Sequence, residues 1–248
     1  MMRWIFAIAV AFATLAAFLV PPAQSFREPE LARIIFFHLP CAISTPVFFF
    51  FGSYLSFQYL RNRAIEWDVR AAAANKLGYI LAVLTMLTGI LFSKTQWGAW
   101  WQWDPRQTSF LLLLLLYAAY FALRASFTDA NKRAANSAAY SCVGALAAFF
   151  LIFVFPRLPY VQQISFHPTN TIVNGGFDRT YSTVLSTLFI LILVLCAWVY
   201  KLAVRASLLE LKLQSYGELE IRGGDTAPTG VVRPIPLSQE GGTSAGRG

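Results

Sequence analysis

The sequence predicts an all-α protein that crosses a membrane with six transmembrane helices and keeps both termini in the cytoplasm. Apolar residues make up 57% of the chain and charged residues only 13%, whereas about a quarter of the residues in a soluble domain are charged. The apolar residues gather in six runs close to the ~20 residues that a helix needs to span a bilayer. Lysine and arginine lie mainly in the connections between those runs, as is typical of polytopic membrane proteins.

Composition and missing motifs exclude other classes of protein. The formal net charge is +8, but a nucleic-acid partner requires a basic face or stripe, and here the cations are dispersed. Cys41, Cys142 and Cys196 stand singly inside apolar runs, which predicts packed thiols. The sequence contains no P-loop, no dinucleotide-binding glycine motif and no H-E-x-x-H, so nothing in it points to nucleotide-driven transport or zinc hydrolysis within this chain.

The first two apolar runs differ from the others in their flanking residues and in length. Residues 4–20 follow a basic residue and precede two prolines, a layout that fits either a cleaved signal peptide or a retained first span. We favour the retained span because five further runs follow it, which gives an even number of crossings. The second run, at about 32–60, is longer than a bilayer requires, and Pro40 and Pro46 predict a kink within it.

The other runs predict four more spans. The third covers about 74–93. The fourth begins at Asp104 because aspartate is a good N-cap, proline is favoured at the next position, and a glutamine stands three residues after the cap. It ends near residue 124, and the fifth and sixth spans cover about 135–155 and 182–204.

The last part of the chain differs in composition from the spans. Residues 1–206 are predicted to form one membrane domain, and residues 207–248 a cytoplasmic tail. The mixed stretch 207–221 is compatible with an interfacial helix. From residue 223 onward, glycine, proline, threonine and serine dominate, which predicts that the tail is largely disordered.

The distribution of cations predicts which connections are external. If the N-terminus is cytoplasmic, 14 of the 20 lysines and arginines lie on the cytoplasmic side and six on the other side. This bias agrees with the positive-inside rule. The connections at 95–106 and 156–181 are therefore predicted to be external.

A tryptophan cluster lies in the external connection at 95–106. Four of the seven tryptophans fall within seven positions there, namely Trp97, Trp100, Trp101 and Trp103. They fit either an aromatic belt at the membrane boundary or a flat, polarizable surface for a planar ligand. A belt spreads its aromatic residues over many helix ends, whereas most indoles of this chain share one loop.

Both histidines of the chain are predicted to lie on the side of the tryptophan cluster. His38 is near the outer end of the second span, and His167 is in the last external connection. Either residue alone would most often be a hydrogen-bonded or interfacial imidazole. Two neutral imidazoles beside a tryptophan surface, however, match the usual axial ligands of iron in a porphyrin. Arg33 is close in sequence to His38, and Arg106 is close to the tryptophans; their guanidinium groups suit the carboxylates of such a ligand. The alternative is that these arginines only set the membrane topology or contact lipid headgroups.

Two motifs carry a resemblance to a known family. The run Trp97-Gly-Ala-Trp-Trp-Gln-Trp-Asp-Pro-Arg106 resembles the tryptophan-rich WWD motif of the haem-handling proteins of cytochrome c maturation. The segment Arg33-Ile-Ile-Phe-Phe-His38-Leu-Pro40, the six spans and the second external histidine resemble specifically the CcmC family. The resemblance covers residues 30–205. It departs from the family before His167, where Tyr160 and Phe166 stand in place of the expected tryptophans.

The resemblance implies a haem-transfer protein rather than a classical enzyme, located in the bacterial inner membrane with its site facing the periplasm. It implies non-covalent haem b, since the chain has no C-x-x-C-H, delivery to the haem chaperone CcmE, and assembly with CcmA, CcmB and CcmD. The implied iron ligands are His38 and His167. The other implied haem-site residues are Trp97, Trp100, Trp101, Trp103, Asp104, Arg33 and Arg106. For Asp104 a purely structural role as N-cap is the alternative.

Rival functions remain open at this point. A CcsA-type cytochrome c haem synthetase shares the WWD motif but should bring more spans and further histidines. A b-type electron-transfer cytochrome should hold its iron ligands on packed spans, whereas His167 is predicted in a loop. A haem-free anchoring or channel subunit would not require the indoles to cluster.

Overall fold

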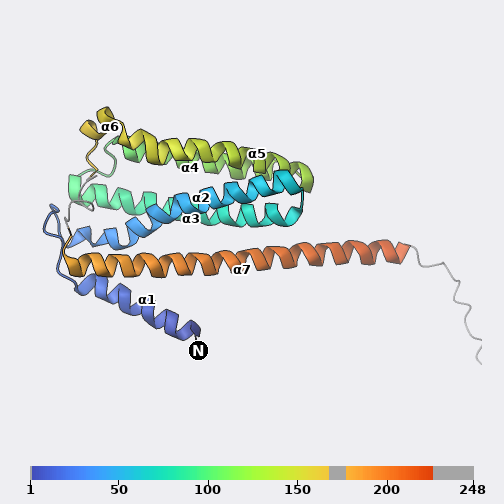
Figure 1. The fold of residues 1–248 in the computed structure, drawn as a ribbon, viewed down its shortest axis with the longest axis horizontal. Helices are drawn as coiled ribbons and strands as arrows, with labels where there is room; N and C mark the ends of the chain where they lie inside the picture. The colour runs from blue at the N-terminus through green and yellow to red at the C-terminus, as the bar shows by residue number, and fades with distance from the viewer. Residues whose placement is uncertain (1, 168–176, 226–248) are drawn as a thin grey trace, which may run out of the picture. The chain divides into compact units, whose positions relative to one another are not determined.

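The predicted all-α fold class is confirmed. A computed structural model describes residues 2–167 and 177–225, and the regular structure of these residues is entirely helical (Figure 1). In chain order the segments are α1 (Met2–Leu19), η1 (Leu31–Ile34), α2 (Ile35–Asn62), α3 (Ile65–Trp97), α4 (Pro105–Ala125), α5 (Ala130–Phe149), η2 (Phe150–Val154), η3 (Phe155–Arg157), α6 (Pro159–Ile164) and α7 (Arg179–Asp225).

Five helical segments are long and apolar enough to cross a membrane, so the chain is a polytopic membrane protein. They are Leu31–Asn62, Ile65–Trp97, Pro105–Ala125, Ala130–Arg157 and Arg179–Gln214. The first helix, α1, is apolar but has only 18 residues. The count of six spans and the cytoplasmic position of both termini therefore remain predictions.

Three helices begin or end at residues that the apolar runs did not indicate. α3 begins at Ile65 rather than near residue 74, because a run of alanines with high helix propensity extends the apolar part backward. α5 begins at Ala130, where the Asp129 carboxylate accepts a hydrogen bond from the Lys132 amide at 2.7 Å. α7 continues without a break to Asp225, so the stretch 207–221 does not form a separate helix. Residues 226–248 lie outside the described part of the chain, and the division into a membrane domain and a disordered tail remains a prediction.

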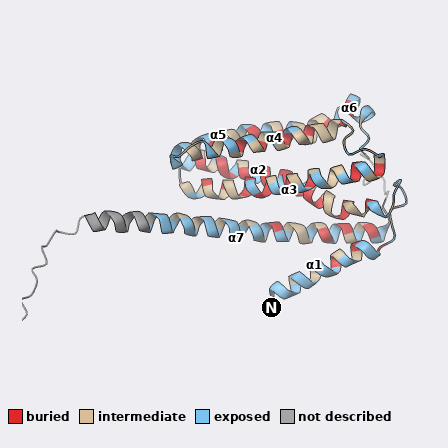
Figure 2. Ribbon diagram, turned by 180° about the vertical axis from the view of Figure 1, so that it is seen from behind, coloured by how far each residue is buried: buried red, intermediate tan, exposed pale blue. Residues whose placement is uncertain are grey.

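α2 is the central helix of the unit formed by residues 1–208. It packs against α3 and α5, and α4 packs against α3 and α5 as well. Another side of α2 meets α7, where the rings of Phe36 and Tyr181 stack with their centroids 4.2 Å apart. α1 joins this group through Ala13 and Ala17, which share a core cluster with Phe36 and Tyr181. Buried residues accordingly run along the facing sides of α2 and α3, while much of α1 is exposed (Figure 2).

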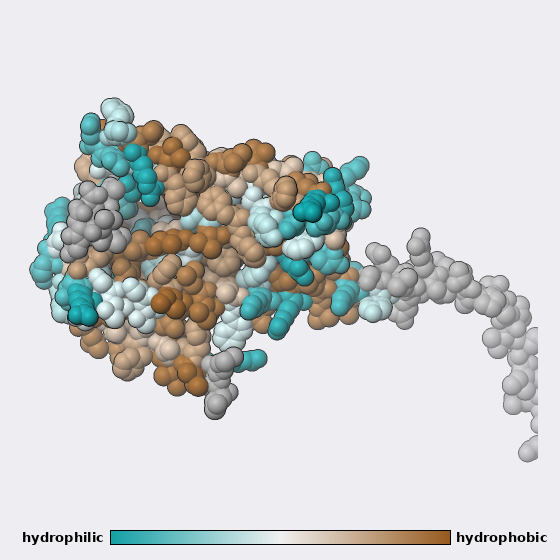
Figure 3. Space-filling view, viewed as in Figure 1, coloured by the Kyte–Doolittle hydropathy of each residue, from teal (hydrophilic) through white to brown (hydrophobic). Residues whose placement is uncertain are grey.

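The outer surface of the helices is apolar along the middle of their length. Exposed phenylalanines, leucines, isoleucines and valines are numerous on α1, α2, α3, α5 and α7. On the face that Figure 3 shows, hydrophobic side chains cover the centre of the helical unit and hydrophilic side chains gather toward the helix ends. A soluble protein would not leave so much contiguous apolar surface in water, so this band is the surface that meets lipid.

An ion pair fixes α3 against α4. Both terminal nitrogens of the Arg124 guanidinium bind the Asp68 carboxylate, each N–O distance being 2.6 Å. The Asp68 side chain is only 4% exposed and that of Arg124 17%. Removing one member of such a buried pair typically costs about 3–5 kcal/mol, because the other charge stays desolvated. The pair therefore holds the helices in register at a point where apolar contacts alone would permit sliding.

Candidate functional site

A cavity of about 280 Å³ brings the two histidines to one place. His38 reaches it from α2, and His167 reaches it from the segment that follows α6. The rest of the wall is mainly apolar and comes from the loop after α1 and from α2, α3, α4, η2 and the segment before α7. The lining residues are Phe26, Ile35, His38, Leu39, Ala42, Thr85, Met86, Gly89, Phe92, Trp97, Arg106, Gln107, Phe110, Ile152, His167 and Phe177.

The ring of His38 is held by α3. Its Nδ1 atom lies 2.9 Å from the Thr88 hydroxyl, and that hydroxyl donates its own hydrogen to the Leu84 carbonyl at 2.7 Å. With the hydroxyl hydrogen directed to Leu84, the Thr88 oxygen accepts a hydrogen bond from His38 in the tautomer that carries its proton on Nδ1. This assignment leaves the lone pair of Nε2 available to a ligand. Gly89 leaves room for the ring, since a Cβ atom there would lie 3.2 Å from His38 Cε1.

His167 lies in a non-helical segment at the edge of the cavity. Its ring is close enough to Arg106 and His38 for their charges to influence it. The surrounding protein removes water from the imidazole and, with smaller contributions from Arg106 and His38, lowers the pKa of His167 to about 4. Part of the residue is exposed, so solvent offsets some of this effect. Because an unperturbed imidazole already titrates near pH ~6.5, His167 is neutral at pH 7 and can donate a lone pair.

Asp104 connects the tryptophan loop to the segment that carries His167. Its Oδ1 atom accepts a hydrogen bond from the Arg106 amide at 2.8 Å, so the predicted N-cap of α4 is confirmed. Its Oδ2 atom accepts hydrogen bonds from the Ser165 hydroxyl at 2.9 Å and from the Phe166 amide at 2.7 Å. The Asp104 side chain is almost fully buried and does not line the cavity. Its carboxylate therefore acts on the site indirectly, by placing His167.

The four clustered tryptophans lie in different surroundings. Trp97 lines the cavity and packs edge-on against Phe92, with centroids 5.5 Å apart. Its ring is tilted against that of Phe166, with centroids 6.2 Å apart. Trp101 packs edge-on against Trp103 with centroids 5.8 Å apart.

Trp100 and Trp103 instead point away from the protein core. They are 55% and 75% exposed, and the ammonium group of Lys94 lies 5.8 Å from the Trp100 ring centroid. Of the four, Trp97 lines the cavity, Trp100 and Trp103 are exposed, and Trp101 is partly buried.

The backbone of the tryptophan loop adopts unusual conformations at two positions. Gly98 ends α3 with a φ of +88°, and Trp103 has a φ of +53°. A positive φ is ordinary for glycine but uncommon for a bulky residue. Gln107 helps to hold this turn, because its Oε1 atom accepts a hydrogen bond from the backbone N–H of Gln102 at 3.1 Å. This is the glutamine that stands three residues after the N-cap of α4, and its side chain binds the loop before the cap.

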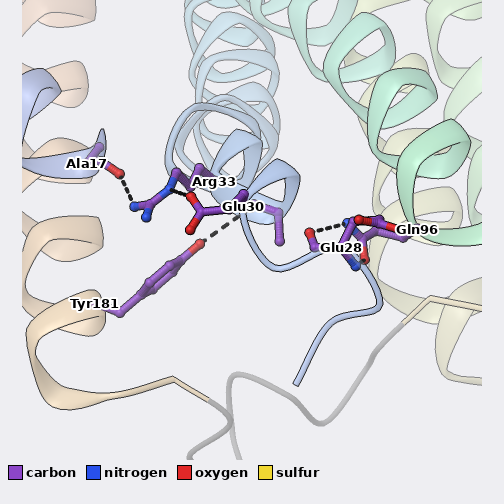
Figure 4. Close-up of polar contacts among 7 residues, drawn as sticks. Ala17, Glu28, Glu30, Arg33, Gln96 and Tyr181 are labelled. Atoms are coloured by element: carbon purple, nitrogen blue, oxygen red, sulfur yellow. Dashed lines mark hydrogen bonds and ion pairs between the residues drawn. The ribbon is translucent and has the colours of Figure 1, made fainter. Parts of the chain in front are cut away.

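The two arginines singled out from the sequence have different positions. Arg106 lines the cavity. Arg33 does not; its Nη1 atom donates to the Ala17 carbonyl at 2.9 Å, and its Nε atom donates to Glu30 at 2.8 Å (Figure 4). The Ala17 carbonyl is in the last turn of α1, where carbonyl groups lack partners within the helix. Arg33 therefore ties the end of α1 to η1.

Several residues of the cavity carried no signal in the sequence. Phe92, Phe110 and Ile152 are ordinary apolar residues of predicted spans. Thr88, which contacts His38 but does not line the cavity, is one of many span threonines. Phe26 lies in the loop after α1, which is fastened to α3 by Gln96. The Gln96 amide group exchanges two hydrogen bonds with the Glu28 backbone, at 3.2 and 3.0 Å (Figure 4).

The chemistry available at the cavity is limited. Among the described residues no group of three or more histidine, cysteine, aspartate or glutamate side chains could hold a bare metal ion. The cavity offers the imidazoles of His38 and His167, the guanidinium of Arg106 and a mainly apolar wall. This set suits a ligand that is large, apolar and flat, supplies most of the coordination of its own metal, and carries an acidic edge.

Comparisons with known proteins give a consistent result. The family model described as "CcmC: Heme exporter protein C" matches residues 1–218. Relatives of the same description are found in several bacteria. The protein of Paracoccus denitrificans is 30% identical over 131 residues, which is 53% of this chain and 54% of the relative. The protein of Bradyrhizobium diazoefficiens is 27% identical over 194 residues, which is 77% of this chain and 72% of the relative.

The protein of Escherichia coli K12 is 33% identical over 119 residues, 46% of each chain. The aligned part thus spans about half the length of the Paracoccus and Escherichia relatives.

Proposed function

Because the chain belongs to the "Heme exporter protein C" (CcmC) family, we propose that it binds haem b in the cavity between His38 and His167 and passes it on during cytochrome c maturation. Haem is here the cargo of the protein. The observation that carries the proposal is that two histidines far apart in the sequence line a single, mainly apolar cavity. Both imidazoles would bind the haem iron from its two faces, as paired axial ligands do in b-type haem proteins.

The other cavity residues suit the rest of a haem molecule. Phe92, Trp97 and Phe110 supply flat apolar surface for the macrocycle. Arg106 supplies a planar cation for a propionate. At about 280 Å³ the cavity lies near the lower end of the ~300–1,000 Å³ of small-molecule sites. Part of the haem would therefore protrude, toward the exposed Trp100 and Trp103.

Partial enclosure fits a protein that releases its cargo. His38 is on a packed helix, whereas His167 is on a short non-helical segment that Asp104 binds through Ser165 and Phe166. Loss of the weaker ligand would open one face of the haem to an acceptor. The acceptor in this proposal is the haem chaperone CcmE, which would dock over the exposed indoles, with CcmA, CcmB and CcmD as further members of the assembly.

The orientation of the site follows from the cation bias. The cavity would face the periplasm across the bacterial inner membrane, since most lysines and arginines lie toward the other end of the spans. A reporter inserted near residue 174 should then read as periplasmic, and one fused after Lys132 as cytoplasmic. A cytoplasmic signal at residue 174 would contradict this orientation.

The function itself is tested by haem binding to the purified full-length chain. We expect one haem per chain, an absorption spectrum of a six-coordinate b-type haem, and complete extraction of the haem by acid acetone, because no C-x-x-C-H is present to hold it covalently. A chain that binds no haem under these conditions would contradict the proposal. Haem that resists extraction would contradict its non-covalent nature.

Thr88 should affect haem through His38. The substitution Thr88→Val keeps the shape of the side chain but removes the acceptor for His38 Nδ1–H. Loss of such a hydrogen bond to a metal-binding histidine typically lowers metal affinity by about 10- to 100-fold. We expect weaker haem binding and a shifted absorption spectrum, measured by haem titration. Thr88→Ser keeps the hydroxyl and is the matched control; equal effects of both substitutions would contradict a positioning role for Thr88.

A further inference from the structure

A second cavity lies at the other end of the spans, between α2, α3 and α7. It has a volume of about 440 Å³ and is lined by Phe51, Tyr54, Leu55, Trp67, Arg70, Tyr200, Lys201, Val204 and Arg205. We name it the basic pocket. We propose that the basic pocket binds the phosphate headgroup of an anionic membrane phospholipid, with the acyl chains lying along α2 and α7.

Three cations line the basic pocket, and its described lining contains no aspartate or glutamate. Arg70 comes from α3, and Lys201 and Arg205 come from successive turns of α7. The ion pairs observed within residues 2–167 and 177–225 involve other cations, namely Arg33 and Arg124. Three positive charges facing one space repel each other, and an anion between them would remove this repulsion. Phosphate esters are well suited because guanidinium and ammonium groups both donate several hydrogen bonds to phosphate oxygens.

The walls of the basic pocket favour a lipid over a freely soluble anion. Arg70 lies over the Trp67 ring, 5.2 Å from its centroid, and Tyr200 packs edge-on against Phe51 with centroids 5.4 Å apart. Phe51 and Tyr54 are 38% and 54% exposed on the outer side of α2. The cations are thus continuous with an apolar surface, and this combination matches a molecule with a charged head and hydrocarbon tails.

The depth of the basic pocket along the helices agrees with a membrane boundary. On α2, Tyr54 follows His38 by 16 positions, which is roughly 24 Å at ~1.5 Å per residue. On α7, Arg205 follows Tyr181 by 24 positions, or roughly 36 Å. The hydrocarbon core of a bilayer is ~30 Å thick. The haem cavity and the basic pocket therefore lie near opposite faces, and basic clusters at the cytoplasmic face meet the more anionic lipid surface.

The proposal is tested by native mass spectrometry of the full-length chain in detergent. The chain is titrated with phosphatidylglycerol or with phosphatidylcholine of identical acyl chains. We expect about tenfold or greater preference for phosphatidylglycerol, and loss of that preference in the double variant Lys201→Gln/Arg205→Gln. Both substituted side chains are exposed, so the variant should fold, and retention of haem binding by the variant checks this directly.

A matched variant separates the basic pocket from the general surface charge. Lys132→Gln/Arg133→Gln removes the same charge from the first turn of α5, outside the lining of the basic pocket. It should keep the lipid preference. Equal loss in both double variants, or no preference in the unaltered chain, would overturn the proposal. Displacement of the lipid by millimolar inorganic phosphate would also overturn it, because the site would then be one for soluble anions.

Discussion

Replacement of His38 or His167 by alanine is expected to abolish six-coordinate haem binding. Each substitution removes one iron-nitrogen bond while leaving the apolar wall of the cavity in place. The loss should appear as a shift to a five-coordinate absorption spectrum or as complete loss of haem from the purified chain. His38→Ala should have the larger effect, because His38 is the ligand held on a packed helix by Thr88.

Added imidazole distinguishes a lost ligand from a damaged fold. Imidazole is small enough to enter the space left by either histidine, and it should restore a six-coordinate spectrum at least in part. Trp100→Ala is the matched control, since this exposed indole lies outside the cavity lining; it should weaken haem retention or transfer without changing the axial ligands. Full haem occupancy with unchanged spectra in both histidine variants would show that the iron ligands are other residues.

Replacement of Asp104 by alanine is expected to release the segment that carries His167. The change removes the N-cap of α4, which typically contributes about 0.5–2 kcal/mol. It also removes the acceptor for the Ser165 hydroxyl and the Phe166 amide, and hydrogen bonds to charged groups contribute about 1.5–3 kcal/mol each. His38 would keep its position, so residual haem should become five-coordinate and dissociate at least tenfold faster.

The substitution Asp104→Asn separates the two roles of this carboxylate. An asparagine oxygen still caps the helix, as asparagine is an equally good N-cap, but its amide nitrogen cannot accept the hydrogen bonds from Ser165 and Phe166. We expect thermal stability between that of the unaltered chain and that of Asp104→Ala, because the cap is kept and the two hydrogen bonds are lost, together with faster haem dissociation. If Asp104→Asn changed neither the spectrum nor the dissociation rate, the connection between the tryptophan loop and His167 would not matter for haem.

The sequence was sufficient for features that depend on neighbouring residues or on composition. Long apolar runs predicted the membrane class and the approximate spans, because a bilayer demands a minimum helix length. The Asp104-Pro105 pair predicted the start of α4, because an N-cap acts on the amide two or three residues ahead. The motif residues from Trp97 to Arg106 predicted the family, which the match over residues 1–218 confirmed.

Only the tertiary structure decided which of the candidate residues meet. His38, His167, Trp97 and Arg106 line one cavity, while Arg33 caps the end of α1 and Asp104 binds the backbone beside His167. In a membrane the lipid-facing and protein-facing sides of a helix are both apolar, so periodicity does not indicate which side is buried. Contacts such as Thr88 with His38, 50 positions apart, or Asp104 with Ser165, 61 positions apart, arise from how the helices pack. That packing depends on the shapes of the helix surfaces and on buried polar contacts between distant residues, and no short stretch of the sequence predicts either.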